Sequence, residues 1–166
     1  GQRNALVEAY DMYGRAAALL GPRADDDPPE LRHRRLEIEL GRLRAGFSFV
    51  DEATQAAMVP WLVAEADRTD DISLAGEVHI LVALLMSFGG ARPDTSPELA
   101  HSLERVRQIA VELGDPAIGA VPSSLIGLFE VFSGQMERGV ERLTEVAPLL
   151  AGKRDFIGSA FAMVAL

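Results

Sequence analysis

The chain has 166 residues, of which 48% are hydrophobic and only 6% aromatic, and 25 acidic against 16 basic side chains give a net charge of −9. This charge opposes attraction to phosphate backbones and anionic lipid, so neither direct nucleic-acid binding nor membrane association is expected. Because the chain has no cysteine, a disulfide framework, a thiolate nucleophile and a zinc-thiolate site are excluded.

The pattern of a secretory leader or a membrane span is not found in the sequence. The N-terminal residues lack a basic region followed by an uninterrupted apolar run. The most apolar segment, residues 78–88, is about half as long as a membrane span. A soluble protein located in the cytoplasm is therefore the expectation.

Apolar spacing and helix start and stop signals predict an all-α protein of eight helices. In chain order, these are expected over residues 6–20, about 28–45, 51–67, 72–88 and 96–113, then from Pro116 to a turn at Gly134, from there to Gly152, and over 155–166.

Three helix starts carry capping signals. Asp27 before Pro28, Ser96 before Pro97 and Asp115 before Pro116 each place a capping side chain next to a proline that suits the first helical position. We therefore expect Asp27 and Asp115 to cap the helices that follow them, and Ser96 with Pro97 to mark the start of the helix over 96–113.

Helical periodicity also predicts which faces are buried. The helix over 28–45 should bury Leu36, Leu40 and Leu43, and the helix over 72–88 is apolar nearly all round. In the helix over 51–67 the small residues and the tryptophan are expected to face inward: Ala53, Ala56, Ala57, Trp61 and Ala64.

Residues 125–148 have the spacing of a complete helical hairpin. Gly127 lies on the first helix, Gly134 supplies the turn and Gly139 lies on the second helix, so that small residues allow the two helices to approach. Gly46 is interpreted as another turn residue. Pro60 follows Gly46 by the same interval by which Pro148 follows Gly134, and these matching intervals indicate a repeat of roughly 44 residues.

Two phrases with the same spacing, Glu30 with His33 and Glu98 with His101, are the strongest metal-binding candidates. Two such pairs with further carboxylates can build a di-iron site in a helical bundle. Both pairs, however, lie in a first helical turn after a proline, where acidic residues are favoured by the helix dipole, so helix capping is the preferred interpretation. His79 is interpreted as a hydrogen-bonded core or groove residue.

The hairpin of residues 125–148, together with Leu40-Gly41 and the junction 113–116, resembles tetratricopeptide repeats. More narrowly, the long units and the junction are similar to the helical sensor regions of bacterial signal-transducing ATPases and LuxR-type transcriptional regulators. This resemblance implies antiparallel helical hairpins stacked as a right-handed α-solenoid. It also implies one repeat domain over residues 1–166, as a fragment of a longer multidomain chain.

In that family the first helix of each hairpin lines a groove. The resemblance places in it Arg35, Arg42, His79, Met86, Ser124, Leu128 and Phe132. The expected function is a non-enzymatic scaffold for signal transduction and protein-protein interaction that binds a protein partner or small effector, without cofactor or metal. Other domains of its parent chain and a second copy, as a homodimer, are further expected partners. The alternative is a helical-bundle metal-binding protein or enzyme that uses the two Glu-His pairs.

Overall fold

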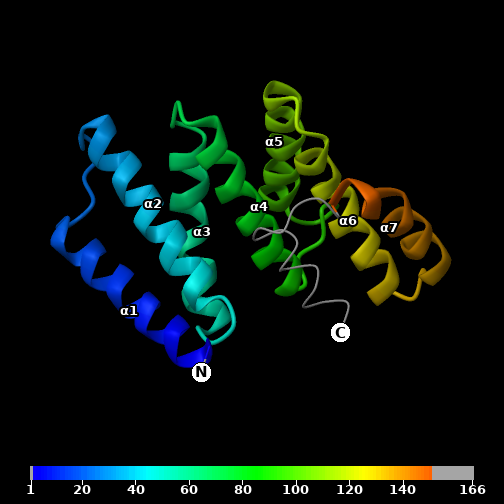
Figure 1. Ribbon diagram of the computed structural model, residues 1–166, viewed down its shortest axis with the longest axis horizontal. Helices are drawn as coiled ribbons and strands as arrows, with labels where there is room; N and C mark the ends of the chain where they lie inside the picture. Colours follow the sequence, from blue (N-terminus) through cyan, green and yellow to red (C-terminus); the bar gives the residue numbers. More distant parts are fainter. Residues whose placement is uncertain (1, 151–166) are drawn as a thin grey trace. The chain divides into compact units, whose positions relative to one another are not determined.

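The computed structural model describes residues 2–150, and these form seven α-helices without a strand (Figure 1). Contacts divide the chain into two compact units, residues 1–90 and 91–166. Unit 1 holds α1 (Gln2–Leu19), α2 (Pro29–Gly46), α3 (Glu52–Ala66) and α4 (Ile72–Phe88). Unit 2 holds α5 (Pro97–Leu113), α6 (Pro116–Phe132) and α7 (Met136–Leu150).

The all-α fold class and seven of the expected helices are confirmed within the described residues. The eighth helix, expected over 155–166, lies outside them. The stacking of the hairpins as a right-handed solenoid and the single repeat domain over 1–166 stay predictions. Among the described helices, none has the combination of length and apolar character that crossing a bilayer requires.

Side-chain caps begin four of the helices. Asp51 accepts a hydrogen bond from the backbone N–H of Thr54, and Asp71 does the same for Leu74. The predicted cap of α6 by Asp115 is confirmed, and Ser96 caps α5 at the predicted helix start; both accept hydrogen bonds from backbone N–H groups of the following first turns. Each cap satisfies an N–H that has no partner inside the helix.

The predicted cap of α2 by Asp27 is wrong. The N-cap position is occupied by Pro28, which has no side-chain cap, and the helix begins at Pro29. The Asp27 carboxylate instead accepts a hydrogen bond from the Nε–H of Arg35, at 3.0 Å. The Asp27 carboxylate therefore binds the charged guanidinium of Arg35 and leaves the first N–H groups of α2 uncapped. Hydrogen bonds from a charged donor are stronger than those from a neutral N–H.

Two glycines of α2 allow α1 to pack closely against it. The ring of Tyr13 lies over Gly41, and the ring of Tyr10 lies over Gly46, where a Cβ atom would come within 2.8 Å of the ring. Gly46 was expected to form a turn, but it is the last residue of α2 and has no positive φ. Glycine is required here because a side chain would collide with the aromatic ring of Tyr10. The backbone conformation of Gly46 does not itself require glycine.

The buried face of α3 differs from the predicted one. Ala53, Ala56, Ala57 and Ala64 are exposed, and Trp61 is half-buried. The buried positions are Gln55, Val59, Leu62, Glu65 and Ala66. The prediction failed because two polar residues are buried on this face, where Gln55 donates to backbone carbonyls of the α2–α3 turn and Glu65 pairs with arginines.

The core of unit 1 is supplied by α2, α3 and α4. The predicted α2 residues Leu36, Leu40 and Leu43 are buried, and every α4 residue from Leu74 to Leu84 except the exposed Glu77 is buried, as its apolar composition indicates. The more extensive helix pairs are α1 with α2 and α3 with α4, whereas α2 packs less extensively on α3. This looser pair is where a cleft opens.

In unit 2, α6 and α7 form the predicted close hairpin (Figure 1). Gly134 provides the turn with a φ of 85°, a conformation that favours glycine. A Cβ on Gly139 would lie 2.6 Å from the carbonyl oxygen of Gly127, so two glycines place the helix backbones in near contact. The hairpin is further joined by Glu130, whose carboxylate accepts two hydrogen bonds from the Arg142 guanidinium, at 2.9 and 3.0 Å.

We expect this ion pair to make the stability of unit 2 depend on acid pH. Hydrogen bonds from Arg142 lower the pKa of Glu130 below its ordinary value of 4.5. A lowered pKa in the folded state contributes stability that is complete above pH 4.5 and is lost as the pH falls through the folded pKa. Glu130→Gln should remove this part of the acid dependence, measured as the urea midpoint over a pH series. Glu112→Gln, which changes an exposed carboxylate of α5, should leave it unchanged.

Candidate charged cleft in unit 1

A cleft of about 610 Å³ lies between the first half of α2 and the junction of α3 with α4. Its volume is within the range of small-molecule sites, about 300–1,000 Å³. Most of its lining side chains are charged, which is unusual for such sites. The lining residues are Pro29, Glu30, Arg32, His33, Arg34, Leu36, Glu37, Glu65, Arg68, Thr69, Asp70 and Asp71.

The deepest charged group of the cleft is Glu65, whose side chain is 9% exposed. Arg32 of α2 lies 3.6 Å from one of its carboxylate oxygens, and Arg68 lies 3.4 Å from the other. Burial of a carboxylate is costly unless it is paired, and here two guanidinium groups share one carboxylate. This group of three side chains therefore carries one net positive charge.

The α2 wall presents charges of both signs. Glu30, Arg34 and Glu37 lie three and four residues apart, so they share one face of the helix. All three side chains are exposed, and Glu37 lies 3.7 Å from the imidazole of His33. Glu30 and Arg34 have no hydrogen bond or ion pair with any described residue, so their charges are available to a ligand.

The opposite wall is formed by the α3–α4 junction. Asp71 caps α4 through the N–H of Leu74, and its own N–H donates to the hydroxyl of Thr69, so the junction is held by local hydrogen bonds. The Asp70 side chain is exposed and has no partner among residues 2–150. This wall therefore offers the carboxylate of Asp70, which has no partner among the described residues, and the guanidinium of Arg68, which pairs with Glu65.

Arg35 and Arg42, which were predicted to bind a ligand, both face α1. Arg35 is 6% exposed and uses its guanidinium on Asp27 and on backbone carbonyls at the end of α1. The Arg42 guanidinium lies 4.8 Å from the centre of the Tyr10 ring and 3.7 Å from the carboxylate of Glu39. Both arginines are engaged inside unit 1, whereas the arginines that line the cleft are their neighbours on other faces of α2.

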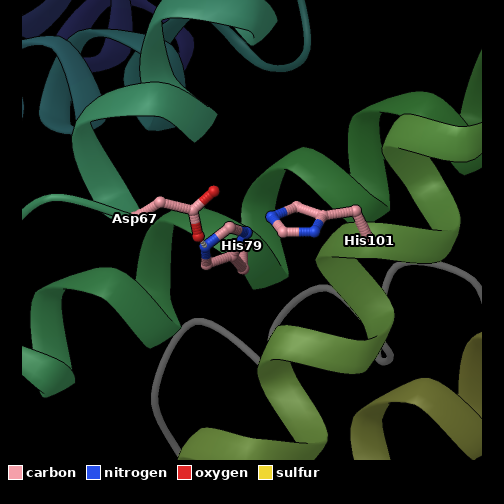
Figure 2. A group of neighbouring side chains, drawn as sticks. All are labelled: Asp67, His79 and His101. Carbon is pink, nitrogen blue, oxygen red and sulfur yellow. Dashed lines mark ion pairs between the residues drawn. The ribbon is translucent and has the colours of Figure 1, made fainter.

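His79 is fully buried in α4, and its Nε2 lies 3.3 Å from a carboxylate oxygen of Asp67 (Figure 2). Glu77, which precedes it by two residues, pairs with Arg44 instead. Met86 lies further along α4 and is half-buried. Neither His79 nor Met86 lines the charged cleft, and the carboxylate beside His79 agrees with the interpretation of this histidine as a core residue.

The other three predicted groove residues belong to α6 in unit 2. Ser124 is fully buried and donates its hydroxyl to the carbonyl of Val121, at 2.6 Å. Leu128 is half-buried, whereas Phe132 is 72% exposed at the end of the helix. The structure therefore gives these residues different environments within their own unit, and a role in binding stays a prediction for them.

The two Glu-His pairs occur in different units. In unit 1, His33 lies near Glu37, one turn after it, rather than near Glu30. In unit 2, Glu98 accepts a hydrogen bond from the hydroxyl of Ser96, the N-cap of α5. The Glu98 contact fits a role at the helix end, which was the preferred interpretation, and Glu30 shares its position at the start of α2.

Arg32, Arg34, Glu65 and Arg68 line the cleft but were not among the predicted groove residues. The available signal was the short interval between Arg68 and Asp71, which places charged residues in a tight junction between two helices. The presence of acidic and basic side chains on one face of α2, at Glu30 and Arg34, was a second signal of a charged binding surface. Neither indicates that the junction lies opposite α2, because that depends on packing between residues more than thirty positions apart.

The cleft can hold and orient a charged ligand, since it offers guanidinium donors and carboxylate acceptors on both walls. No protein-family model, curated protein or solved structure matches this chain.

Proposed function

We propose that this chain is a non-enzymatic, TPR-like binding and sensing scaffold of a bacterial transcriptional or signalling regulator. In this proposal unit 1 recognises a partner segment or small effector through the charged cleft. Binding is then passed to other domains of the parent chain through the stacked hairpins. The resemblance to tetratricopeptide repeats supports the scaffold, and the cleft supports the binding role.

The observation that carries the proposal is the presence of unpaired charges on the two walls of one cleft. Arg34 and Asp70 lie on its two walls without partners among the described residues, while the arginines that face α1 are all engaged. A protein that needed these charges only for solubility would not require them to line a cavity. Their position favours recognition of a charged partner.

A ligand in this cleft would contact α2 and the α3–α4 junction at once. Because α2 packs less extensively on α3 than on α1, such a ligand would strengthen the weaker joint of unit 1. A ligand that binds only the folded state stabilises it by about 2.7 kcal/mol at a concentration of 100 Kd. Ligand binding would therefore stabilise the packing of α2 against the α3–α4 junction.

The test is a screen of the purified chain against single compounds: amino acids, polyamines, dicarboxylates, nucleotides and short peptides. We expect at least one compound to raise the thermal midpoint in a saturable way and to shift amide NMR signals of the cleft. We also expect it to be recovered chemically unchanged, as a binding protein requires.

A tryptophan introduced into the cleft tests whether the response arises there, and a tryptophan outside the cleft is the control. Asp70→Trp should abolish the response, whereas Asp11→Trp, on the exposed surface of α1 outside the cleft, should preserve it. The proposal would be wrong if no compound gave saturable binding, or if the shifted amides lay outside the cleft. Turnover of a bound compound would show an enzyme instead.

A further inference from the structure

From the arrangement of charges in the cleft we infer its ligand class: a zwitterionic ligand of short-peptide size, with a carboxylate near one end and an ammonium or guanidinium group near the other. This inference rests on the proposed binding function and adds the chemistry that the site recognises. It depends on both walls of the cleft carrying both signs of charge.

A ligand with charges of only one sign would meet repulsion at each wall. On α2, the cation Arg34 lies between two acidic residues, Glu30 and Glu37. On the junction, the guanidinium of Arg68 is followed by the carboxylate of Asp70. Any group attracted by one of these side chains is close to another that repels it, unless the ligand also carries the opposite charge.

The field of the whole protein adds to this selection. A purely anionic ligand would be opposed by the net charge of −9. A purely cationic ligand would be attracted by the carboxylates of the lining, but it would leave the guanidinium of Arg34 without an acceptor. A ligand with one charge of each sign avoids both penalties.

The groups that remain for the ligand are those without partners in the described part of the chain. Arg34 can donate two parallel hydrogen bonds to a carboxylate, and this is the geometry that a guanidinium provides. Asp70 and Glu30 can accept from an ammonium or guanidinium group. The cleft volume of about 610 Å³ is large enough for a ligand that reaches both walls.

Four capped tetrapeptides test the inference by isothermal titration calorimetry at low salt. One carries an aspartate and a lysine at its two ends, one carries only the aspartate, one only the lysine, and one is all alanine. We expect the zwitterionic peptide to bind at least about tenfold more tightly than any of the other three, because a charge-assisted hydrogen bond contributes about 1.5–3 kcal/mol.

Two charge-removing variants locate the binding. Arg34→Gln and Asp70→Asn should each weaken binding of the zwitterionic peptide about tenfold. Their matched controls, Arg15→Gln and Asp11→Asn, change the net charge equally at exposed positions of α1 and should leave the affinity unchanged. Thermal midpoints of all four variants should equal that of the parent chain, since none of these side chains has a partner among residues 2–150.

The inference is overturned if the lysine-only or the aspartate-only peptide binds as tightly as the zwitterionic one, or if the cleft variants bind it like their controls. Its failure can be told apart from failure of the proposed function. If no peptide binds but another compound of the screen does so at the cleft, the binding scaffold stands and the ligand class is wrong. If nothing binds there, both are wrong.

Discussion

Replacing Arg35 with alanine is expected to lower the free energy of unfolding of unit 1 by about 3–5 kcal/mol, the usual cost of removing one partner from a buried ion pair. The Arg35 guanidinium donates to the Asp27 carboxylate and to the backbone carbonyls of Leu20, Gly21 and Pro22. These carbonyls follow α1, where no further helical N–H is available. Truncation would therefore leave a carboxylate and three carbonyls without their donor.

Urea denaturation followed by circular dichroism measures this effect. Arg35→Lys should recover only part of the loss, because an ammonium group keeps the charge but cannot reach four acceptors with the geometry of a guanidinium. Arg34→Ala, at the adjacent exposed position, should change the free energy of unfolding by less than about 0.5 kcal/mol. A small effect of Arg35→Ala would mean that Arg35 is free for a ligand, as the sequence had suggested.

In unit 2 the largest expected effect is that of Gly139→Ala, which should destabilise the α6–α7 hairpin by about 2 kcal/mol. A Cβ at this position would lie 2.6 Å from the carbonyl oxygen of Gly127 and 2.8 Å from the backbone nitrogen of Val131. Since both neighbours are backbone atoms, relief requires the two helices to separate. Overpacking of this kind costs about 1–3 kcal/mol, which exceeds the gain of up to about 1 kcal/mol from the higher helix propensity of alanine.

Gly119→Ala is the matched control in the same unit. Its Cβ would lie 3.4 Å from the Cβ of Ala110, which is an acceptable contact, so the propensity gain should stabilise α6 by up to about 1 kcal/mol. Opposite signs for the two substitutions in thermal unfolding would establish the close approach of α6 and α7. Equal, stabilising effects would show that the helices do not touch at Gly139.

Helix positions and several helix contacts could be predicted because their signals are local. Ser96 and Asp115 cap the helices that follow them, and a cap depends on only a few consecutive residues. The leucine stripe of α2 follows from helical periodicity, and the glycines of the α6–α7 hairpin follow from the need for small residues at a close contact. In each case the physical cause is contained within one helix or one hairpin.

Which polar groups are buried could not be predicted in this way. The small residues of α3 indicated one inner face, but the structure buries the face that carries Gln55 and Glu65. Gln55 is satisfied by carbonyls of the preceding turn and Glu65 by two arginines, one of them on α2. A buried polar side chain is stable only when its partners are present, and the position of a partner on another helix cannot be read from periodicity.

The amino-acid sequence by itself thus determined that this chain is helical, which segments form its described helices, and that one hairpin is closely packed, although α1 begins at Gln2 and not at residue 6. Only the tertiary structure decided the use of its charges: Arg35 against Asp27 and the end of α1, and Arg34 and Asp70 on the two walls of a cleft. The physical reason is that helix formation depends on neighbours within a few residues, whereas pairing of charges depends on which helices meet in space.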